Sequence, residues 1–142
     1  MNTPDAAAHI AQRLEHGGIP GLASAYLFGS EAEGRSHRES DIDIGVLLDW
    51  QAYPSRRDRF EARLRLLSEL ARGLEGRPVD VVVLNDAPPQ LARHIATRGR
   101  RVFCLDAAMD HAFVRDAQLR AADIDPFLRR MRELKLRAIR RS

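Results

Sequence analysis

The sequence has little cysteine, few aromatic residues and no long apolar run. Cys104 is the single cysteine among 142 residues, which excludes an internal disulfide framework. No apolar stretch approaches the roughly 20 residues that a membrane-spanning helix needs. The first residues carry Asp5 and have the pattern of an amphipathic helix, so they do not resemble a signal peptide. We therefore expect a cytoplasmic protein without a membrane partner.

The charge is slightly positive and is concentrated at one end of the chain. The formal net charge is +3, and the basic residues are densest in the final stretch "RRMRELKLRAIRRS". Such a tail can contact an acidic partner or a nucleic-acid backbone, or it can form a solvated helix face. It contains no aromatic residue on which a base could stack. We therefore expect no direct binding of nucleic acid.

Apolar periodicity and turn residues predict nine elements in the order α-β-β-α-β-α-β-α-α. The predicted strands cover residues 23–28, 41–48, 79–85 and 100–106, and the first three helices cover residues 4–16, 54–73 and 88–99. Two carboxy-terminal helices are expected at about 107–120 and 124–140. The sequence contains no internal repeat. The pattern predicts one α/β domain over residues 1–142, built on a small mixed β-sheet that helices flank.

Two of the predicted helices carry a clear apolar face. In the helix from 54 to 73 the stripe is Phe60, Leu64, Leu67, Leu70 and Leu74. In the last helix it is Phe127, Met131, Leu134 and Ala138.

Acidic residues interrupt two of the predicted strands. In "DIDIGVLL" the alternation places Asp41 and Asp43 on one face and the aliphatic residues on the other. Two carboxylates that converge to about 4 Å repel each other by about 4 kcal/mol at an effective dielectric constant of 20. A divalent cation would compensate this repulsion, and Mg²⁺ favours such hard oxygen ligands. Asp80 interrupts "PVDVVVL" in the same way, and it would join the other two if its strand lies beside theirs.

A short glycine-serine loop precedes these carboxylates. Gly29 follows the first predicted strand, and because it lacks a Cβ atom its backbone can approach a ligand closely. Ser30 adds a hydroxyl group, and both residues offer backbone N–H groups that can hold phosphate. A phosphate-binding loop beside paired metal-binding carboxylates is what phosphoryl or nucleotidyl transfer requires, with two metal ions clamping the attacking and leaving oxygens.

These residues resemble the signature of the polymerase-β-like nucleotidyltransferase superfamily. The signature is Gly29-Ser30, ten intervening residues, and Asp41-Ile42-Asp43. The text "FGSEAEG" followed by "ESDIDIGVLL" is similar to the minimal nucleotidyltransferases (MNT). The segment "RPVDVVVLNDAPPQLARHIATRGRRVFC" is similar to the MNT antitoxins that partner HEPN-domain toxins.

The resemblance implies a role for each matching residue. Gly29 and Ser30 would hold the phosphates of ATP, and Asp41 and Asp43 would ligate Mg²⁺ in a two-metal site, in the manner of the superfamily. Asp80 would complete the metal site and assist deprotonation of the acceptor. The implied reaction is transfer of AMP from ATP to a tyrosine hydroxyl of the cognate HEPN ribonuclease toxin, with release of pyrophosphate, which neutralises the toxin.

Other interpretations of the same residues remain open at this point. Asp41 and Asp43 could be solubilising charges of a strand edge, and Asp80 could cap its strand or pair with Arg77. If the chain is a nucleotidyltransferase, the acceptor could be the hydroxyl of a small molecule such as an antibiotic. The chain could also neutralise a toxin by binding alone, without catalysis.

Overall fold

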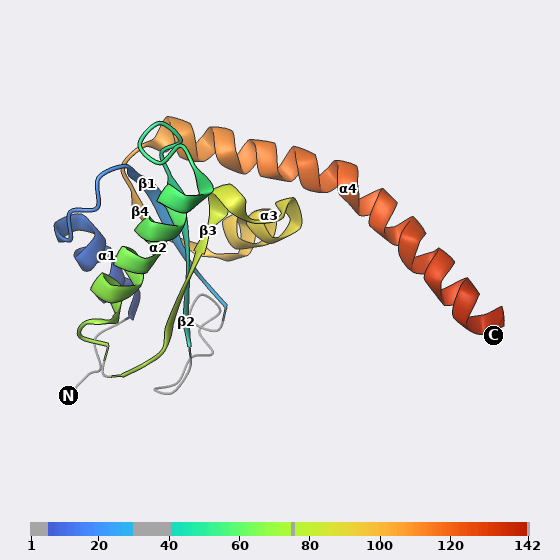
Figure 1. Cartoon of the computed structure of the whole chain (residues 1–142), viewed down its shortest axis with the longest axis horizontal. Coiled ribbons are helices and arrows are strands. Elements are labelled where there is room, and N and C mark those ends of the chain that lie inside the picture. Colours follow the sequence, from blue (N-terminus) through green and yellow to red (C-terminus); the bar gives the residue numbers. More distant parts are fainter. Residues whose placement is uncertain (1–5, 30–40, 75, 142) are drawn as a thin grey trace.

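The computed structural model describes residues 6–29, 41–74 and 76–141. In chain order the elements are α1 (Ala6–His16), β1 (Leu22–Phe28), β2 (Ile42–Leu48), α2 (Arg56–Ala71), β3 (Val79–Val83), the 3₁₀ turn η1 (Leu84–Asp86), α3 (Pro89–Arg98), β4 (Arg100–Cys104) and α4 (Ala107–Arg141). The strands form one sheet in the order β3-β2-β1-β4 (Figure 1). β1 pairs antiparallel with β2 and β4, whereas β2 and β3 are parallel, so the sheet is mixed as predicted.

Helices cover both faces of the sheet. α1 and α2 bury their apolar residues on one face, together with Ile42, Ile44, Val46 and Leu48 of β2. α3 and the first half of α4 cover the other face, where Ile95 and Phe113 pack around Tyr26 and Leu47. Alternate residues of β2 therefore face different layers, as the period of two requires. The same alternation assigns the positions of Asp43 and Gly45 to the face that α3 covers.

The buried face of α2 is not the predicted one. Phe60 is 54% exposed and Leu64 is 48% exposed, whereas Arg59 is only 6% exposed. The residues of α2 that are buried are Arg59, Ala62, Leu66 and Leu70. The helix is thus rotated so that a charged residue enters the packed layer and part of the leucine stripe faces outward.

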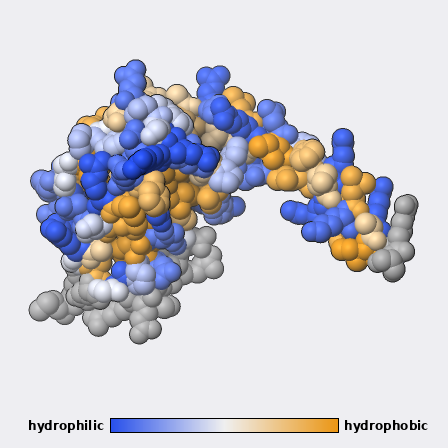
Figure 2. Space-filling model, in the orientation of Figure 1, coloured by the Kyte–Doolittle hydropathy of each residue, from blue (hydrophilic) through white to orange (hydrophobic). Residues whose placement is uncertain are grey.

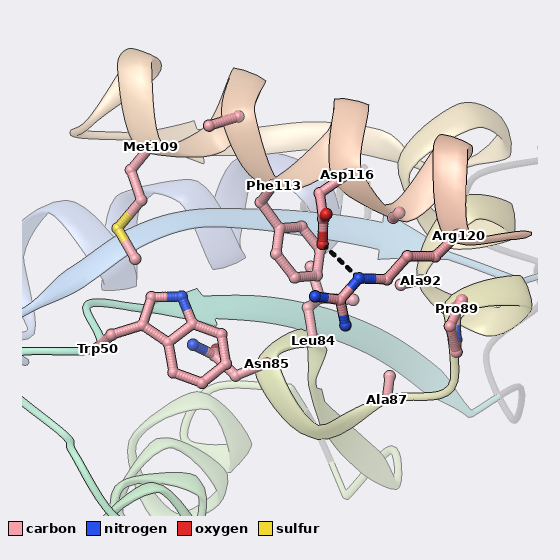
Figure 3. Close-up of a pocket in the computed structure, with 12 residues that line it drawn as sticks. Trp50, Leu84, Asn85, Ala87, Pro89, Ala92, Met109, Phe113, Asp116 and Arg120 are labelled. Atoms are coloured by element: carbon pink, nitrogen blue, oxygen red, sulfur yellow. Dashed lines mark ion pairs between the residues drawn. The ribbon is translucent and has the colours of Figure 1, made fainter.

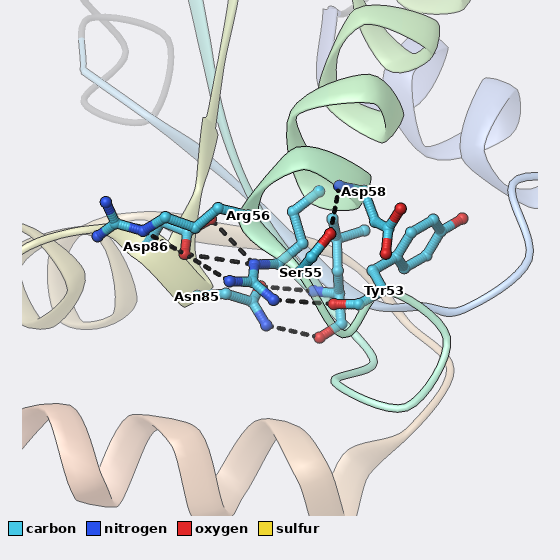
Figure 4. Close-up of polar contacts among 8 residues, drawn as sticks. Tyr53, Ser55, Arg56, Asp58, Asn85 and Asp86 are labelled. Atoms are coloured by element: carbon cyan, nitrogen blue, oxygen red, sulfur yellow. Dashed lines mark hydrogen bonds and ion pairs between the residues drawn. The ribbon is translucent and has the colours of Figure 1, made fainter.

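A polar network accounts for the burial of Arg59, and Figure 4 labels two of its partners, Tyr53 and Asp86. Its guanidinium group donates to both carboxylate oxygens of Asp86, at 3.0 Å each, and to the carbonyl oxygen of Tyr53 at 2.8 Å. It also lies over the ring of Trp50, 5.0 Å from the centroid. At the start of the helix, the Ser55 hydroxyl accepts the N–H of Asp58 at 3.0 Å as an N-cap. Because the buried charge is paired, it fixes the start of α2 against the turn after β3.

The two predicted carboxy-terminal helices are one continuous helix, and this prediction was therefore wrong. α4 runs for 35 residues, and Pro126 lies inside it. A proline costs one backbone hydrogen bond and usually kinks or breaks a helix interior. Here the predicted break was placed before the proline, and no such break occurs. Figure 1 shows the first half of α4 crossing the domain and the second half projecting away from it.

The first half of α4 is anchored to the sheet by a buried aspartate. Asp110 is 1% exposed, and one of its carboxylate oxygens accepts hydrogen bonds from the hydroxyl groups of Ser24 and Tyr26, at 2.6 Å each. Its other oxygen accepts from Arg101 at 3.1 Å. Burial, and then the hydrogen bond to this carboxylate, raise the pKa of Tyr26 well above its ordinary value. Within the described residues, no helix has the length and apolarity needed to span a bilayer.

Candidate active site

The predicted carboxylates lie on neighbouring strands at one end of the sheet. Asp43 is the second residue of β2, and its partner in the parallel pairing with β3 is Asp80. Asp41 immediately precedes β2 and is exposed. Because residues two apart on a strand share a face, and paired residues of adjacent strands also do, all three positions lie on one face of the sheet. The condition that β3 lies beside β2 is therefore met.

Gly29 lies directly against the central carboxylate. It follows β1, whose last residue, Phe28, pairs with Asp43. Its φ angle is +72°, in the left-handed region that favours glycine, and a Cβ atom here would lie 2.7 Å from Oδ2 of Asp43. A side chain at this position would thus displace the carboxylate. Ser30, the second predicted residue of this loop, lies outside the described residues.

Asp80 is held by an arginine from α2. Nη2 of Arg63 lies 3.1 Å from Oδ1 of Asp80, and Nε of Arg63 donates to the carbonyl oxygen of Val81 at 2.6 Å. β3 is the edge strand of the sheet, so Arg63 covers part of its open edge. The side chain of Asp80 is 57% exposed and remains accessible to solvent. This pair could not be predicted from the sequence, because Arg63 is one of several arginines on the exposed side of the helical stripe.

The electrostatics of the cluster favour the binding of a positive charge. The pKa of Asp43 is raised above its ordinary value by partial burial, then by the negative charge of Asp80, and then by that of Asp41. The three carboxylates therefore interact, and the central one is destabilised in its ionised form. A bound cation would reverse this effect.

The donor set fits a hard divalent cation. Three carboxylates on one face supply the oxygen ligands that Mg²⁺ prefers, and the absence of a Cβ atom at Gly29 leaves room beside Asp43. Among the described residues, no three acidic, histidine or cysteine side chains are gathered closely enough to hold a metal ion. To bind one ion the three carboxylates would have to converge, and a cation between them would offset their repulsion.

A cavity opens beside this cluster along the edge of β3. Its volume is about 520 Å³, and its lining includes Asp80 and Arg63 together with the apolar side chains of Phe60, Val82 and Leu91. Figure 2 shows apolar residues exposed over α2 and β3 on this side of the molecule. An acceptor group could therefore reach Asp80 from the open edge of the sheet.

A second cavity lies at the other end of β2 and is separate from the carboxylates (Figure 3). It has a volume of about 440 Å³ and is lined by Trp50, Met109 and Phe113, among others. An ion pair of 2.9 Å joins Asp116 and Arg120 at this cavity. Because β2 rises about 3.3 Å per residue, about 20 Å separates Trp50 from the carboxylate end of the strand. The lining of this cavity does not include Asp41, Asp43 or Asp80.

The fold and the arrangement of the site define a nucleotidyltransferase. The family model for "Polymerase beta, Nucleotidyltransferase" matches residues 10–108, and the chain belongs to this family. The match contains Gly29 and the three aspartates, and it ends where α4 begins.

The chain is also similar to particular relatives. It is 37% identical over 91 residues to the protein adenylyltransferase MntA of Shewanella oneidensis, an alignment that covers 64% of this chain and 60% of that protein. The aligned part of the chain thus spans less than two thirds of the length of this curated relative. A solved toxin–antitoxin structure with AMP-PNP has 29% identity and a TM-score of 0.66, covering 88% of this chain and 97% of the matched chain.

A further solved structure contains the tri-AMPylated Shewanella oneidensis HEPN toxin in complex with MNT antitoxin. It has 26% identity and a TM-score of 0.60, covering 89% of this chain and 95% of the matched chain. These similarities confirm the predicted fold class and the predicted resemblance to MNT antitoxins.

Proposed function

We propose that this protein is a Mg²⁺-dependent adenylyltransferase that acts on a HEPN-domain toxin as its antitoxin. The observation that carries the proposal is the cluster of Asp41, Asp43 and Asp80 on one face of the sheet, with the backbone of Gly29 against Asp43. The relatives support the acceptor, because one is an adenylyltransferase and another is an MNT antitoxin in complex with an AMPylated toxin. The cytoplasm, which supplies ATP, is the compartment that this activity requires.

We assign a role to each of these residues, and the role of Ser30, which lies outside the described residues, rests on the family resemblance. Gly29 and Ser30 hold the triphosphate of ATP through backbone N–H groups and the serine hydroxyl. Asp41 and Asp43 bind Mg²⁺, and Asp80 completes this set from β3. Mg²⁺, when bound, neutralises charge on the phosphates and polarises the α-phosphate.

The transfer step requires an acceptor hydroxyl beside Asp80. The hydroxyl oxygen of a tyrosine attacks the α-phosphorus of ATP, the bond from this phosphorus to the bridging oxygen of pyrophosphate breaks, and Asp80 accepts the hydroxyl proton. Asp80 lines the open cavity at the edge of β3, so a protein acceptor can approach it without passing through the domain. Arg63 positions Asp80 in the free protein.

The proposal is tested by AMP transfer with a purified partner. The chain is incubated with Mg²⁺, ATP labelled at the α-phosphate, and the HEPN protein encoded beside it. The same reaction is run with the Asp41→Asn/Asp43→Asn variant, which keeps the size of both side chains. Labelled HEPN protein with the wild-type chain, and at least about 1,000-fold less label with the variant, is the expected result.

Two other results would replace the proposal. If the double variant neutralises the toxin as well as the wild type does, and neither labels it, the chain is a binding inhibitor without catalysis. If the wild type labels a small hydroxylated molecule but leaves the HEPN protein unlabelled, the acceptor is not a protein.

A further inference from the structure

Beyond the ion pair that joins Asp125 to Arg93 of α3, the last part of α4 exposes a large apolar surface. From residue 126 to residue 140 every side chain is exposed. The exposed large apolar residues in this stretch are Phe127, Leu128, Met131, Leu134, Leu136 and Ile139, which are 40% to 62% exposed. We refer to residues 126–140 as the arm; Figure 1 shows it projecting from the domain, and Figure 2 shows its apolar side chains.

The apolar residues of the arm continue the face by which α4 packs on the domain. Ala117 and Ala121 are buried, and residues 7 and 11 positions further along a helix return to the same side. Leu128 therefore lies on the same side of α4 as the buried residues Ala117 and Ala121, but beyond the domain. Met131 lies beside Leu128 on the helix surface. The arm is about 22 Å long at 1.5 Å per residue, so the apolar stripe has the length of an ordinary interface helix.

A helix of this kind requires a covering surface. An isolated helix of about 15 residues is marginally stable in water, and helical stability in proteins comes chiefly from packing of an apolar face. Contiguous exposed apolar patches on soluble proteins mark interaction sites. Phe127 and Met131 also belong to the residue types that are enriched at the core of protein–protein interfaces.

The charge of the arm identifies the chemistry of the occupant. The arm contains six basic residues and one acidic residue, a net charge of +5. A second copy of the chain would bring the same positive charge against it. Lys135 lies within the stripe, because it is four residues after Met131 and four residues before Ile139. When an apolar face with a cation at its centre is covered, the cation requires a carboxylate in the covering surface. The core of a lipid bilayer contains no carboxylate.

We propose that the arm docks into an apolar groove, bordered by aspartate and glutamate side chains, on the protein that accepts the nucleotide. Phe127, Met131 and Leu134 have the i, i+4, i+7 spacing by which an amphipathic helix anchors in such a groove. The choice of the acceptor protein as occupant rests on the function proposed above. The arm binds this protein outside the catalytic site, while the carboxylates at the end of the sheet act on its hydroxyl group.

The proposal is tested by measuring the affinity of the full chain for its HEPN partner by calorimetry. In the Met131→Glu/Leu134→Glu variant, two carboxylates enter the stripe, and we expect the Kd to rise at least about 100-fold. The Met131→Ala/Leu134→Ala variant keeps a strong helix former at both positions, and we expect at least about a 10-fold rise. Circular dichroism establishes that the arm is still helical in each variant.

Lys135→Met separates the possible occupants. If a carboxylate faces Lys135, the loss of the ammonium group leaves that carboxylate unpaired, and the Kd rises at least about 10-fold. If the stripe binds a second copy or a membrane, the longer apolar stripe binds more tightly instead. The matched control is Glu133→Ala/Arg140→Ala, which changes the opposite side of the arm and leaves the net charge unchanged; we expect less than about a 3-fold effect.

Transfer kinetics distinguish a failure of the arm from a failure of the proposed reaction. In the Met131→Ala/Leu134→Ala variant we expect a higher KM for the HEPN protein with an unchanged kcat and an unchanged KM for ATP. Wild-type affinity in both stripe variants, no affinity of the wild-type chain for the HEPN protein, or tighter binding by Lys135→Met would each overturn the proposal. Partner binding that depends on the stripe, without any AMP transfer, would support the arm and refute the reaction.

Discussion

Replacement of Gly29 by alanine tests the contact that defines the site. The φ angle of Gly29 is +72°, and an alanine in this left-handed region costs about 1–2 kcal/mol of backbone strain. The new methyl carbon would also lie 2.7 Å from Oδ2 of Asp43, closer than such atoms approach. The carboxylate must rotate away, which adds about 0.5–1.5 kcal/mol if its side chain leaves a preferred rotamer.

The chain offers a matched control at Gly18. Its φ angle is +64°, and a Cβ atom there would have no neighbouring atom within 4 Å. Gly18→Ala therefore has nearly the same backbone strain without the contact to a carboxylate. We expect both variants to lose about 1–2 kcal/mol in urea denaturation, with a somewhat larger loss for Gly29→Ala.

The two variants should differ far more in activity than in stability. Displacement of a catalytic group by about 1 Å lowers a rate by about 100-fold. We expect Gly29→Ala to reduce AMP transfer by at least that factor, and Gly18→Ala to retain a rate close to that of the wild type. Equal transfer rates for the two variants would refute the placement of Gly29 against Asp43.

Two further predictions concern charged groups. Asp110→Ala leaves the hydroxyl groups of Ser24 and Tyr26 without their acceptor. We therefore expect the free energy of unfolding, measured by urea denaturation, to fall by about 3 kcal/mol. A fall of less than about 1 kcal/mol would contradict the anchoring role of Asp110. Asp43→Asn should raise the melting temperature of the metal-free chain at pH 7, because a raised pKa means that ionised Asp43 destabilises the fold. The destabilisation by ionised Asp43 is fully present above the folded-state pKa of Asp43 and disappears below its ordinary pKa near 3.8. The rise in melting temperature of the variant should therefore vanish as the pH falls through this range. A rise that does not depend on pH would show that the charge of Asp43 is not its cause.

The sheet and the position of the carboxylates could be predicted because local patterns determine them. The period of two along β2 separates Asp43 from Ile42 and Ile44, and the structure confirms that these isoleucines are fully buried. The parallel pairing of β2 with β3 joins segments that are far apart in the sequence, so local patterns do not predict it. From the sequence, Asp80 could be placed in the site only if its strand lay beside β2. The interaction of Asp80 with Arg63 depends on the rotation of α2 about its axis, which differs from the rotation that the leucine stripe predicts.

The errors arose where tertiary contacts overrode the pattern. The stripe through Phe60 and Leu64 predicted a buried face, but the pairing of Arg59 with Asp86 favours a different rotation of α2. The sequence of β1 contains a pattern that indicates a buried polar partner such as Asp110. Ser24 and Tyr26, two residues apart, place two hydroxyl groups on one side of an apolar strand. The roles assigned to the individual site residues stay predictions.

Calorimetric titration of Mg²⁺ in the presence of AMP-PNP tests the central claim most directly, which is that carboxylates of two adjacent strands share one cation. The wild-type chain should bind the Mg²⁺–nucleotide complex, and Asp43→Asn and Asp80→Asn should each weaken this binding at least about 10-fold. Unchanged affinity in both variants would mean that these two strands do not form a common metal site.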